Sequence, residues 1–256
     1  MRTPSVISRP SAVRAPTDDD YAVSAEFYDV LQAQQDAIRV HRLYGRDVAS
    51  ARHGVLDVGA GTGRVTLMSL LESRVAVYAV EPARAMRTPL MSRLAALSPE
   101  LRERITVHPR RLEEARLCAV ADVAVCHNTV ACLAPAARRA LWPALARALV
   151  PGGRLLLQLP PARPPDEETV RVFPDQRVGE HTYGGRMVMS AAGSRIRTRF
   201  DYRVRGAEGV LREHTETFWM WPAPRAEMVR DLAEHGFVPL PGRDEPTVLT
   251  LHLRPR

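Results

Sequence analysis

Short apolar runs alternate with longer amphipathic stretches through most of the chain. Val55, Leu56 and Val58 form a brief aliphatic run, as in a strand that is buried on both faces. Similar runs follow at residues 75–80, 105–108, 122–127, 154–159 and 248–253. Between them, helices are expected over about residues 25–44, 64–71, 83–97, 141–149 and 224–236. Strands that alternate with helices in this way predict an α/β fold with a doubly wound, mostly parallel sheet.

The first strand leads directly into a glycine turn, Gly59-Ala60-Gly61-Thr62-Gly63. Glycines let the backbone turn sharply and lie against a ligand, and the N–H groups of the next helix point back at that ligand. Glu81 ends the second strand, where a carboxylate can accept hydrogen bonds from both hydroxyls of a ribose. We interpret the loop and this acid as a nucleoside site. The alternative, a glycine turn that only packs a helix, does not account for the matching acid.

The spacing of the glycines narrows the choice of nucleoside. A dinucleotide fold prefers G-x-G-x-x-G, but here Arg64 stands where the third glycine would be. A P-loop needs Gly-Lys-Ser/Thr, and the chain contains no lysine. Residues 56–63 (LDVGAGTG) instead resemble the cofactor loop of the class I S-adenosylmethionine (SAM)-dependent methyltransferases. Residues 80–86 (VEPARAM) resemble their ribose segment, and residues 149–154 (LVPGGR) resemble the turn before their fifth strand.

The resemblance implies a Rossmann-like seven-stranded methyltransferase sheet, with SAM as cofactor and S-adenosylhomocysteine as product. It implies cofactor contacts in the loop, the ribose segment and the ends of the third and fourth strands, from Asp57, Gly59, Ala60, Gly61, Gly63, Glu81, Pro82, Arg111, Leu112 and Cys126. Arg111 takes the place of the acid that the family usually sets against the adenine amino group, so the chain departs from the pattern there.

After Leu159, a stiff PPARPP stretch is followed by alternating patterns at residues 186–189, 195–204 and 210–221. Turns are expected at Gly184-Gly185, at residues 192–194 and at residues 206–209. We expect an inserted antiparallel sheet, apolar on one face and rich in arginine on the other. It resembles the insertion of the glycine and aminosugar N-methyltransferase branch, which caps the substrate pocket and often supports oligomers. The predicted organisation is a disordered tail (1–20), a methyltransferase core with a lid helix (21–160 and 222–256) and a cap (161–221).

Candidate catalytic residues lie at the fourth strand and in the first helix. Ligands bind beyond the carboxyl ends of parallel strands, which places His127 and Asn128 near the methyl donor; a purely structural histidine is the alternative. Phe27-Tyr28-Asp29 resembles the Tyr-Asp pair of an N-terminal lid, although Tyr28 could simply pack the helix on the sheet. Candidate substrate contacts, which could equally be ordinary sheet or packing residues, are Tyr21, Asn128, His181, Tyr183 and Trp219. No cluster has metal-ligand spacing.

The composition of the chain limits the kinds of partner and location that are expected. The net charge is +7, but the arginines are scattered without a basic run, which argues against nucleic acid. No apolar stretch is long enough for a membrane span or a signal peptide, so a cytoplasmic location is expected. The three cysteines form no C-x-x-C pair and are expected to be reduced.

These features predict an enzyme that methylates an amine nitrogen of a small metabolite or peptide, in a biosynthetic pathway for a natural product. A homo-oligomer remains compatible with the inserted sheet. The alternatives are O-methylation of a small hydroxyl or carboxyl substrate, methylation of RNA, and SAM binding without catalysis.

Overall fold

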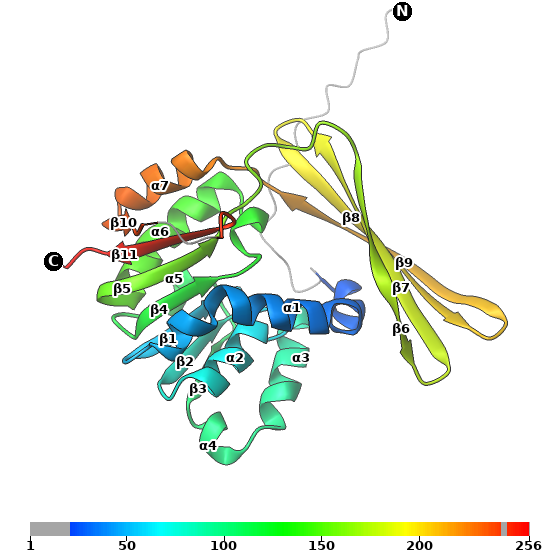
Figure 1. Ribbon diagram of the computed structural model, residues 1–256, viewed down its shortest axis with the longest axis horizontal. Coiled ribbons are helices and arrows are strands. Elements are labelled where there is room, and N and C mark those ends of the chain that lie inside the picture. The colour runs from blue at the N-terminus through cyan, green and yellow to red at the C-terminus, as the bar shows by residue number, and fades with distance from the viewer. Residues whose placement is uncertain (1–20, 242–244, 256) are drawn as a thin grey trace, which may run out of the picture.

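The computed structural model describes residues 21–241 and 245–255, and it contains two separate sheets (Figure 1). The predicted disordered tail, residues 1–20, lies outside the described residues. Sheet A has seven strands in the order β10-β11-β5-β4-β1-β2-β3. Their bounds are β1 Gly54–Val58, β2 Ala76–Val80, β3 Ile105–His108, β4 Ala121–Cys126, β5 Leu149–Gln158, β10 Phe237–Pro239 and β11 Val248–Leu253.

Sheet A confirms the predicted seven-stranded, mostly parallel architecture. The central strand β1 is buried along its whole length and pairs in parallel with β2 and β4. β11 runs antiparallel to β5, and β10 antiparallel to β11. The strand order reverses between β1 and β4, so the carboxyl ends of these two strands flank the crevice where such sheets bind ligands.

Helices cover both faces of sheet A (Figure 1). One face carries α1 (Ser24–Ala49), α2 (Arg64–Glu72) and α3 (Arg84–Ala95), whose apolar side chains share a core with β1. The other face carries α6 (Pro135–Ala148) and α7 (Arg225–Ala233), with Trp142 fully buried. Short turns of helix complete the list: α4 (Pro99–Arg102), α5 (Leu112–Ala115) and the 3₁₀ turn η1 (Val130–Cys132). Within the described part of the chain, no helix has both the length and the apolar character of a membrane span.

The helix bounds correct two expectations. α1 continues five residues beyond the predicted end at Tyr44, to Ala49, because Tyr44 and Val48 are buried against the sheet. α6 begins at Pro135, not at residue 141. Proline suits the first turn of a helix because its missing N–H would have no intrahelical partner there.

Sheet B is the inserted antiparallel sheet, with the strand order β6-β7-β8-β9. Its strands are β6 (Thr169–Val178), β7 (His181–Ala192), β8 (Arg195–Gly206) and β9 (Gly209–Met220). The predicted turn at Gly184-Gly185 is wrong, since β7 runs through both residues. A Cβ atom at Gly184 would lie 2.2 Å from Asp175 Oδ1, so this glycine leaves room for the Asp175 side chain of the neighbouring strand β6. β6 was not predicted, because most of its residues are exposed and Pro174 interrupts the strand.

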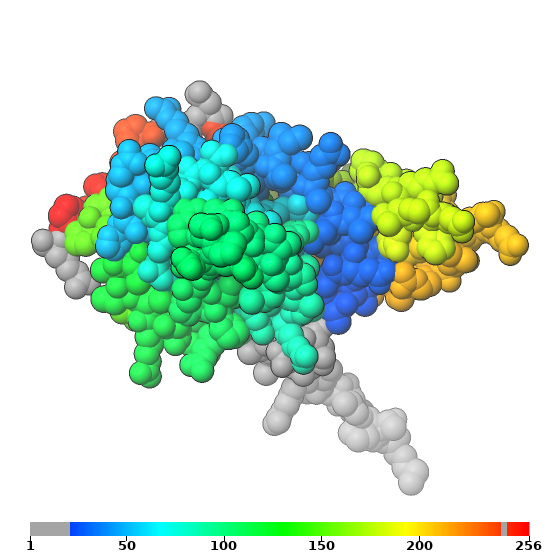
Figure 2. Space-filling view, turned by 90° about the horizontal axis from the view of Figure 1, so that it is seen from below, coloured from blue at the N-terminus to red at the C-terminus, as the bar shows by residue number. Residues whose placement is uncertain are grey.

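The two faces of sheet B differ as predicted. Phe173, Tyr202 and Val204 form an apolar cluster with Phe27 and Leu31 of α1. Figure 2 shows the start of α1, in blue, directly against the yellow-green strands of this sheet. Alternate residues of β8 turn to the other face and include five arginines: Arg195, Arg197, Arg199, Arg203 and Arg205. The division into core and cap at residues 160 and 222 stays a prediction.

Candidate active site

The glycine loop connects β1 to α2 at the carboxyl end of sheet A. Gly59, Gly61 and Gly63 have φ angles of 74°, 57° and 95°. Residues other than glycine rarely adopt this region of backbone conformation. The N–H groups of Gly59 and Ala60 donate to the carbonyl of Val80 at 2.8 and 3.1 Å, which ties the loop to the end of β2. A Cβ atom on Gly61 would meet nothing within 4 Å. The loop therefore presents its backbone to open space at Gly61, as a ligand cradle requires.

Two buried carboxylates lie beneath this loop. Glu81 is 7% exposed; its Oε2 accepts the N–H of Gly61 and its Oε1 that of Ala83, both at 2.8 Å. Each carboxylate oxygen can accept a second hydrogen bond, so Glu81 can bind ribose hydroxyls while it still holds the loop. Asp57 is 1% exposed and accepts a 2.6 Å hydrogen bond from Thr66 Oγ1. The loop and these acids fit the nucleoside and the cationic centre of SAM.

Burial raises the pKa of Asp57 to about 7, with a smaller contribution from the charge of Glu81. The folded protein therefore holds more protons than the unfolded chain, whose aspartates titrate near pH 4. The contribution of Asp57 to the free energy of unfolding is therefore fully present below about pH 4 and is lost as the pH rises through 7. Relative to Asp57→Asn, we expect the unliganded wild type to lose up to about 1.4 kcal/mol of stability per pH unit across this window.

Urea unfolding of both proteins at several pH values measures this difference. His127 acts in the opposite direction, because burial lowers its pKa to about 4 and its contribution to stability rises from about pH 4 to 6.5. Both proteins contain His127, so subtraction removes its contribution. A difference curve that stays flat from pH 4 to 7 would contradict the prediction.

His127 and Asn128 follow β4 and adjoin the loop. Asn128 has a left-handed backbone (φ 53°), which asparagine tolerates better than most residues. Its Nδ2 lies 3.2 Å from His127 Nε2, and His127 Nδ1 lies 3.1 Å from Tyr44 Oη. An amide nitrogen can only donate, so His127 Nε2 accepts and the ring proton lies on Nδ1. His127 is thus neutral, 9% exposed and hydrogen-bonded at both nitrogens.

Tyr28 of α1 approaches the same residues. Its hydroxyl donates to Asp36 Oδ2 at 3.3 Å, and the Asn128 side chain is a further hydrogen-bond partner. The guanidinium of Arg64 lies over the Tyr28 ring, 5.4 Å from its centroid. Burial, and then the charge of Asp36, raises the pKa of Tyr28 well above its ordinary value. The phenol is therefore protonated at neutral pH. The structure thus brings Tyr28, His127 and Asn128 together at the carboxyl end of β4.

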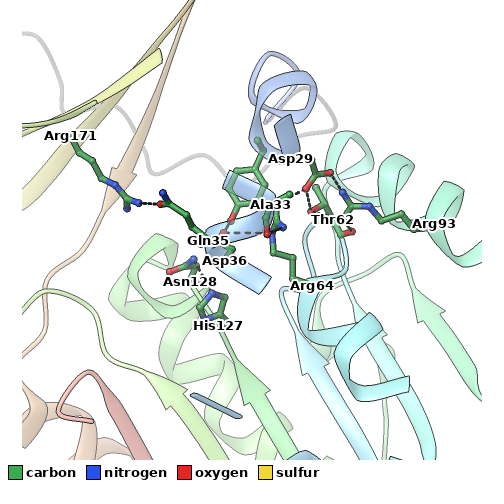
Figure 3. Close-up of polar contacts among 11 residues, drawn as sticks. Asp29, Ala33, Gln35, Asp36, Thr62, Arg64, Arg93, His127, Asn128 and Arg171 are labelled. Atoms are coloured by element: carbon green, nitrogen blue, oxygen red, sulfur yellow. Dashed lines mark hydrogen bonds and ion pairs between the residues drawn. The ribbon is translucent and has the colours of Figure 1, made fainter. Parts of the chain in front are cut away.

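Asp29 fastens α1 to the glycine loop (Figure 3). Its Oδ1 accepts hydrogen bonds from Thr62 Oγ1 at 2.8 Å and Arg64 Nη2 at 2.7 Å. Its Oδ2 pairs with Arg93 of α3, and Arg93 also donates to the Thr62 carbonyl at 2.7 Å. Asp29 belongs to the predicted lid pair, but its contact with Arg93 was not predicted, because the two residues lie far apart along the chain.

Asp36 was also missed, although a signal was present. It falls among the buried positions of α1 between Leu31 and Val40, where an acid interrupts the apolar face of the helix. An acidic residue at such a position needs a polar partner, and the partners are Tyr28 and Arg64.

The remaining predicted cofactor contacts lie around the loop but differ in exposure. Cys126 and Leu112 are buried in the core of sheet A, and Arg111 precedes α5 as its N-terminal cap residue. Pro82 is partly exposed, and its carbonyl accepts a 2.7 Å hydrogen bond from Arg87. Contacts of these residues with the cofactor stay predictions.

Three of the predicted substrate residues belong to sheet B, but they lie on different parts of it. Tyr183 lies on the apolar face, 6.0 Å from Phe27 between ring centroids. Trp219 lies on the opposite face, where Arg195 stacks over it, and His181 is exposed at the β6–β7 turn. Tyr21 precedes α1 and stacks on Phe218 of β9 with the ring centroids 4.6 Å apart. The structure does not bring His181 or Trp219 to the residues at the end of β4.

Comparison with known proteins agrees with this geometry. The family described as a methyltransferase domain matches residues 56–155. No curated protein matches the sequence. Among solved structures, CalS10, an amino pentose methyltransferase from Micromonospora echinaspora, is 21% identical with a TM-score of 0.65, covering 95% of this chain and 99% of that one.

Two further structures share the fold. The sugar N-methyltransferase KedS8 from Streptoalloteichus sp. ATCC 53650 is 21% identical with a TM-score of 0.69 and covers 99% of both chains. DesVI from Streptomyces venezuelae is 19% identical with a TM-score of 0.73, covering 92% of this chain and 98% of that one. The matched domain contains the glycine loop, Asp57 and Glu81. Residues 56–155 thus match a methyltransferase domain, and the solved structures share the fold of almost the whole chain.

Proposed function

We propose that this protein transfers the methyl group of SAM to an amine nitrogen of a small metabolite or peptide, in the biosynthesis of a natural product. An aminosugar is the favoured acceptor. The observation that carries the proposal is the chemistry at the end of β4. His127 is neutral and hydrogen-bonded at both nitrogens, and Tyr28 holds its proton.

This set of groups suits an amine better than a hydroxyl. An amine with a free lone pair attacks without further activation and needs only hydrogen-bond acceptors to orient it. A hydroxyl needs a base in the transition state, and His127 Nε2 already accepts a hydrogen bond from Asn128. The raised pKa of Tyr28 prevents its phenol from acting as that base near neutral pH.

The roles we assign follow from position. Asp57, Glu81 and the backbone from Gly59 to Gly63 hold the cofactor. When bound, SAM supplies a methyl group on a sulfonium sulfur, which becomes a neutral thioether after transfer. Tyr28 contacts the acceptor nitrogen, and His127, held by Tyr44 and Asn128, forms the neighbouring wall of the site. α1 and the apolar face of sheet B exclude water from the reacting groups, and the product ammonium releases its proton to solvent.

Structural relatives support the acceptor class at the level of fold. CalS10 and KedS8 are described as methyltransferases of an amino pentose and of a sugar nitrogen. MtfA, described as a glycopeptide N-methyltransferase, has a TM-score of 0.50 and 21% identity, covering 83% of this chain and 93% of that one. All three act on nitrogen or on amino compounds, which favours an amine for this protein.

Incubation with SAM carrying a ¹³C-methyl group, together with a panel of free aminosugars, aminosugar phosphates and short peptides, tests the proposal. We expect turnover to S-adenosylhomocysteine and a product whose methyl signal couples to an N-linked carbon in NMR spectra. A methyl signal on oxygen would overturn the assignment of the acceptor. Tight SAM binding by calorimetry without any turnover across the panel would indicate a protein that binds SAM without catalysis.

A further inference from the structure

Asp36 is a buried carboxylate on α1 that faces the acceptor end of the site without reaching the glycine loop. It is 9% exposed, accepts the Tyr28 hydroxyl at 3.3 Å and lies 3.5 Å from Arg64 Nε. Arg64 is paired more closely with Asp29, at 2.7 Å. Asp36 therefore accepts its hydrogen bond from Tyr28, while Arg64 contributes a nearby positive charge.

This contact sets the direction of the Tyr28 hydroxyl. An ionised carboxylate can only accept hydrogen bonds, so the phenol proton points toward Asp36. The phenol oxygen then accepts on its other side, where the Asn128 side chain is its partner in the unliganded protein. Without Asp36, the hydroxyl could rotate and donate to whatever acceptor stands opposite it.

The direction matters for an amine nucleophile. An amine offers N–H groups as donors and a single lone pair, and that lone pair has to reach the methyl carbon. A hydroxyl that donates to the nitrogen would occupy the lone pair, whereas an oxygen that accepts from an N–H would leave it free. The second arrangement orients the nucleophile without blocking it.

We propose that Asp36 is a positioning residue for methyl transfer: it holds the Tyr28 hydroxyl as a donor toward itself, so that the Tyr28 oxygen accepts an N–H of the acceptor amine. This inference rests on the proposed amine acceptor. Asp36 does not contact substrate or cofactor; it acts through Tyr28.

Three variants separate this role from a structural one. Asp36→Leu removes the acceptor, and we expect kcat to fall about 10- to 100-fold with the dissociation constant of SAM unchanged. Asp36→Asn keeps a carbonyl oxygen that can accept the same hydroxyl, so kcat stays within about fivefold of wild type. In a Tyr28→Phe background, Asp36→Leu causes no further loss, because the group through which it acts is already absent.

Asp47→Asn is the matched control. Asp47 is a second buried acid on α1, 5% exposed, and it pairs with Arg154 at 2.9 Å. Its substitution removes a buried charge from the same helix outside the acceptor site, so it reports the effect on folding alone. We expect it to lower the melting temperature while kcat stays near the wild-type value, measured with the aminosugar of the panel that turns over fastest.

A second measurement needs no acceptor. In SAM-bound protein labelled with ¹³Cζ-tyrosine, a hydroxyl held in a buried hydrogen bond exchanges slowly and gives two ¹³Cζ lines in mixed H₂O and D₂O. We expect two lines for Tyr28, assigned by their loss in Tyr28→Phe, and a single averaged line in Asp36→Leu.

Each outcome decides the proposal. Equal losses of kcat in Asp36→Asn and Asp36→Leu would show that the charge acts without orienting the hydroxyl. Additive losses in the Tyr28→Phe background, or a Tyr28 signal unaffected by Asp36→Leu, would also overturn it. If the product is methylated on oxygen, the proposed function fails, while the tyrosine spectrum still reports whether Asp36 orients Tyr28.

Discussion

Glu81→Gln is expected to weaken SAM binding by about 100-fold. Glu81 accepts the N–H groups of Gly61 and Ala83, one on each oxygen. Glutamine has one carbonyl oxygen and one amide nitrogen, so one of these N–H groups would face another donor. The loop would lose an anchor, and the ribose hydroxyls would lose a charged acceptor. A hydrogen bond to a charged group contributes about 1.5–3 kcal/mol, and each 1.4 kcal/mol is a factor of ten in affinity.

Isothermal titration with SAM measures the effect. Glu72→Gln is the control, because Glu72 is an exposed residue at the end of α2 that pairs with His41 on the surface; its substitution should leave SAM affinity within about twofold. Wild-type affinity in Glu81→Gln would remove Glu81 from the cofactor site.

Gly59→Ala is expected to destabilise the fold by about 2–5 kcal/mol. Gly59 has a φ of 74°, and an added Cβ would lie 2.2 Å from Thr129 Oγ1 and 2.6 Å from Thr129 Cγ2. Thr129 cannot easily move aside, because its hydroxyl donates to the carbonyl of Val58 at 2.9 Å. The substitution therefore combines an unfavourable backbone angle with a collision in a packed region.

Gly152→Ala separates these two costs. Gly152 has nearly the same φ, 79°, and an added Cβ there would meet nothing within 4 Å. We expect it to cost about 1–2 kcal/mol from the backbone alone. Urea unfolding of both variants gives the comparison. Equal losses would mean that Thr129 yields and that the loop is less tightly packed than its geometry implies.

The common position of the glycine loop and Glu81 could be predicted from the sequence because each directly follows a strand of the parallel sheet. The glycine loop follows β1 directly, and Glu81 follows β2, so strand order alone brings them to one edge of the sheet. His127 could be placed because it directly follows β4, which lies next to β1 in the sheet.

The contacts made by α1 could not be predicted in this way. Asp29 meets Arg93 through the docking of one helix on another, and no spacing rule connects residues on separate helices. The face of sheet B on which Trp219 lies could not be predicted either, for a different reason. Side chains alternate between the faces of a strand, and only the observed packing of Phe27 shows which face of sheet B turns toward α1.

Three consecutive residues of α1 contact three different parts of the molecule. Phe27 packs into sheet B, Tyr28 reaches the end of β4, and Asp29 binds the glycine loop. Each residue turns a helix by 100°, so one residue inserted or deleted between Asp29 and Val40 would rotate these side chains away from their partners while the rest of α1 stays packed on sheet A. The length of α1 between Asp29 and its contacts with sheet A is therefore fixed by these three sets of partners.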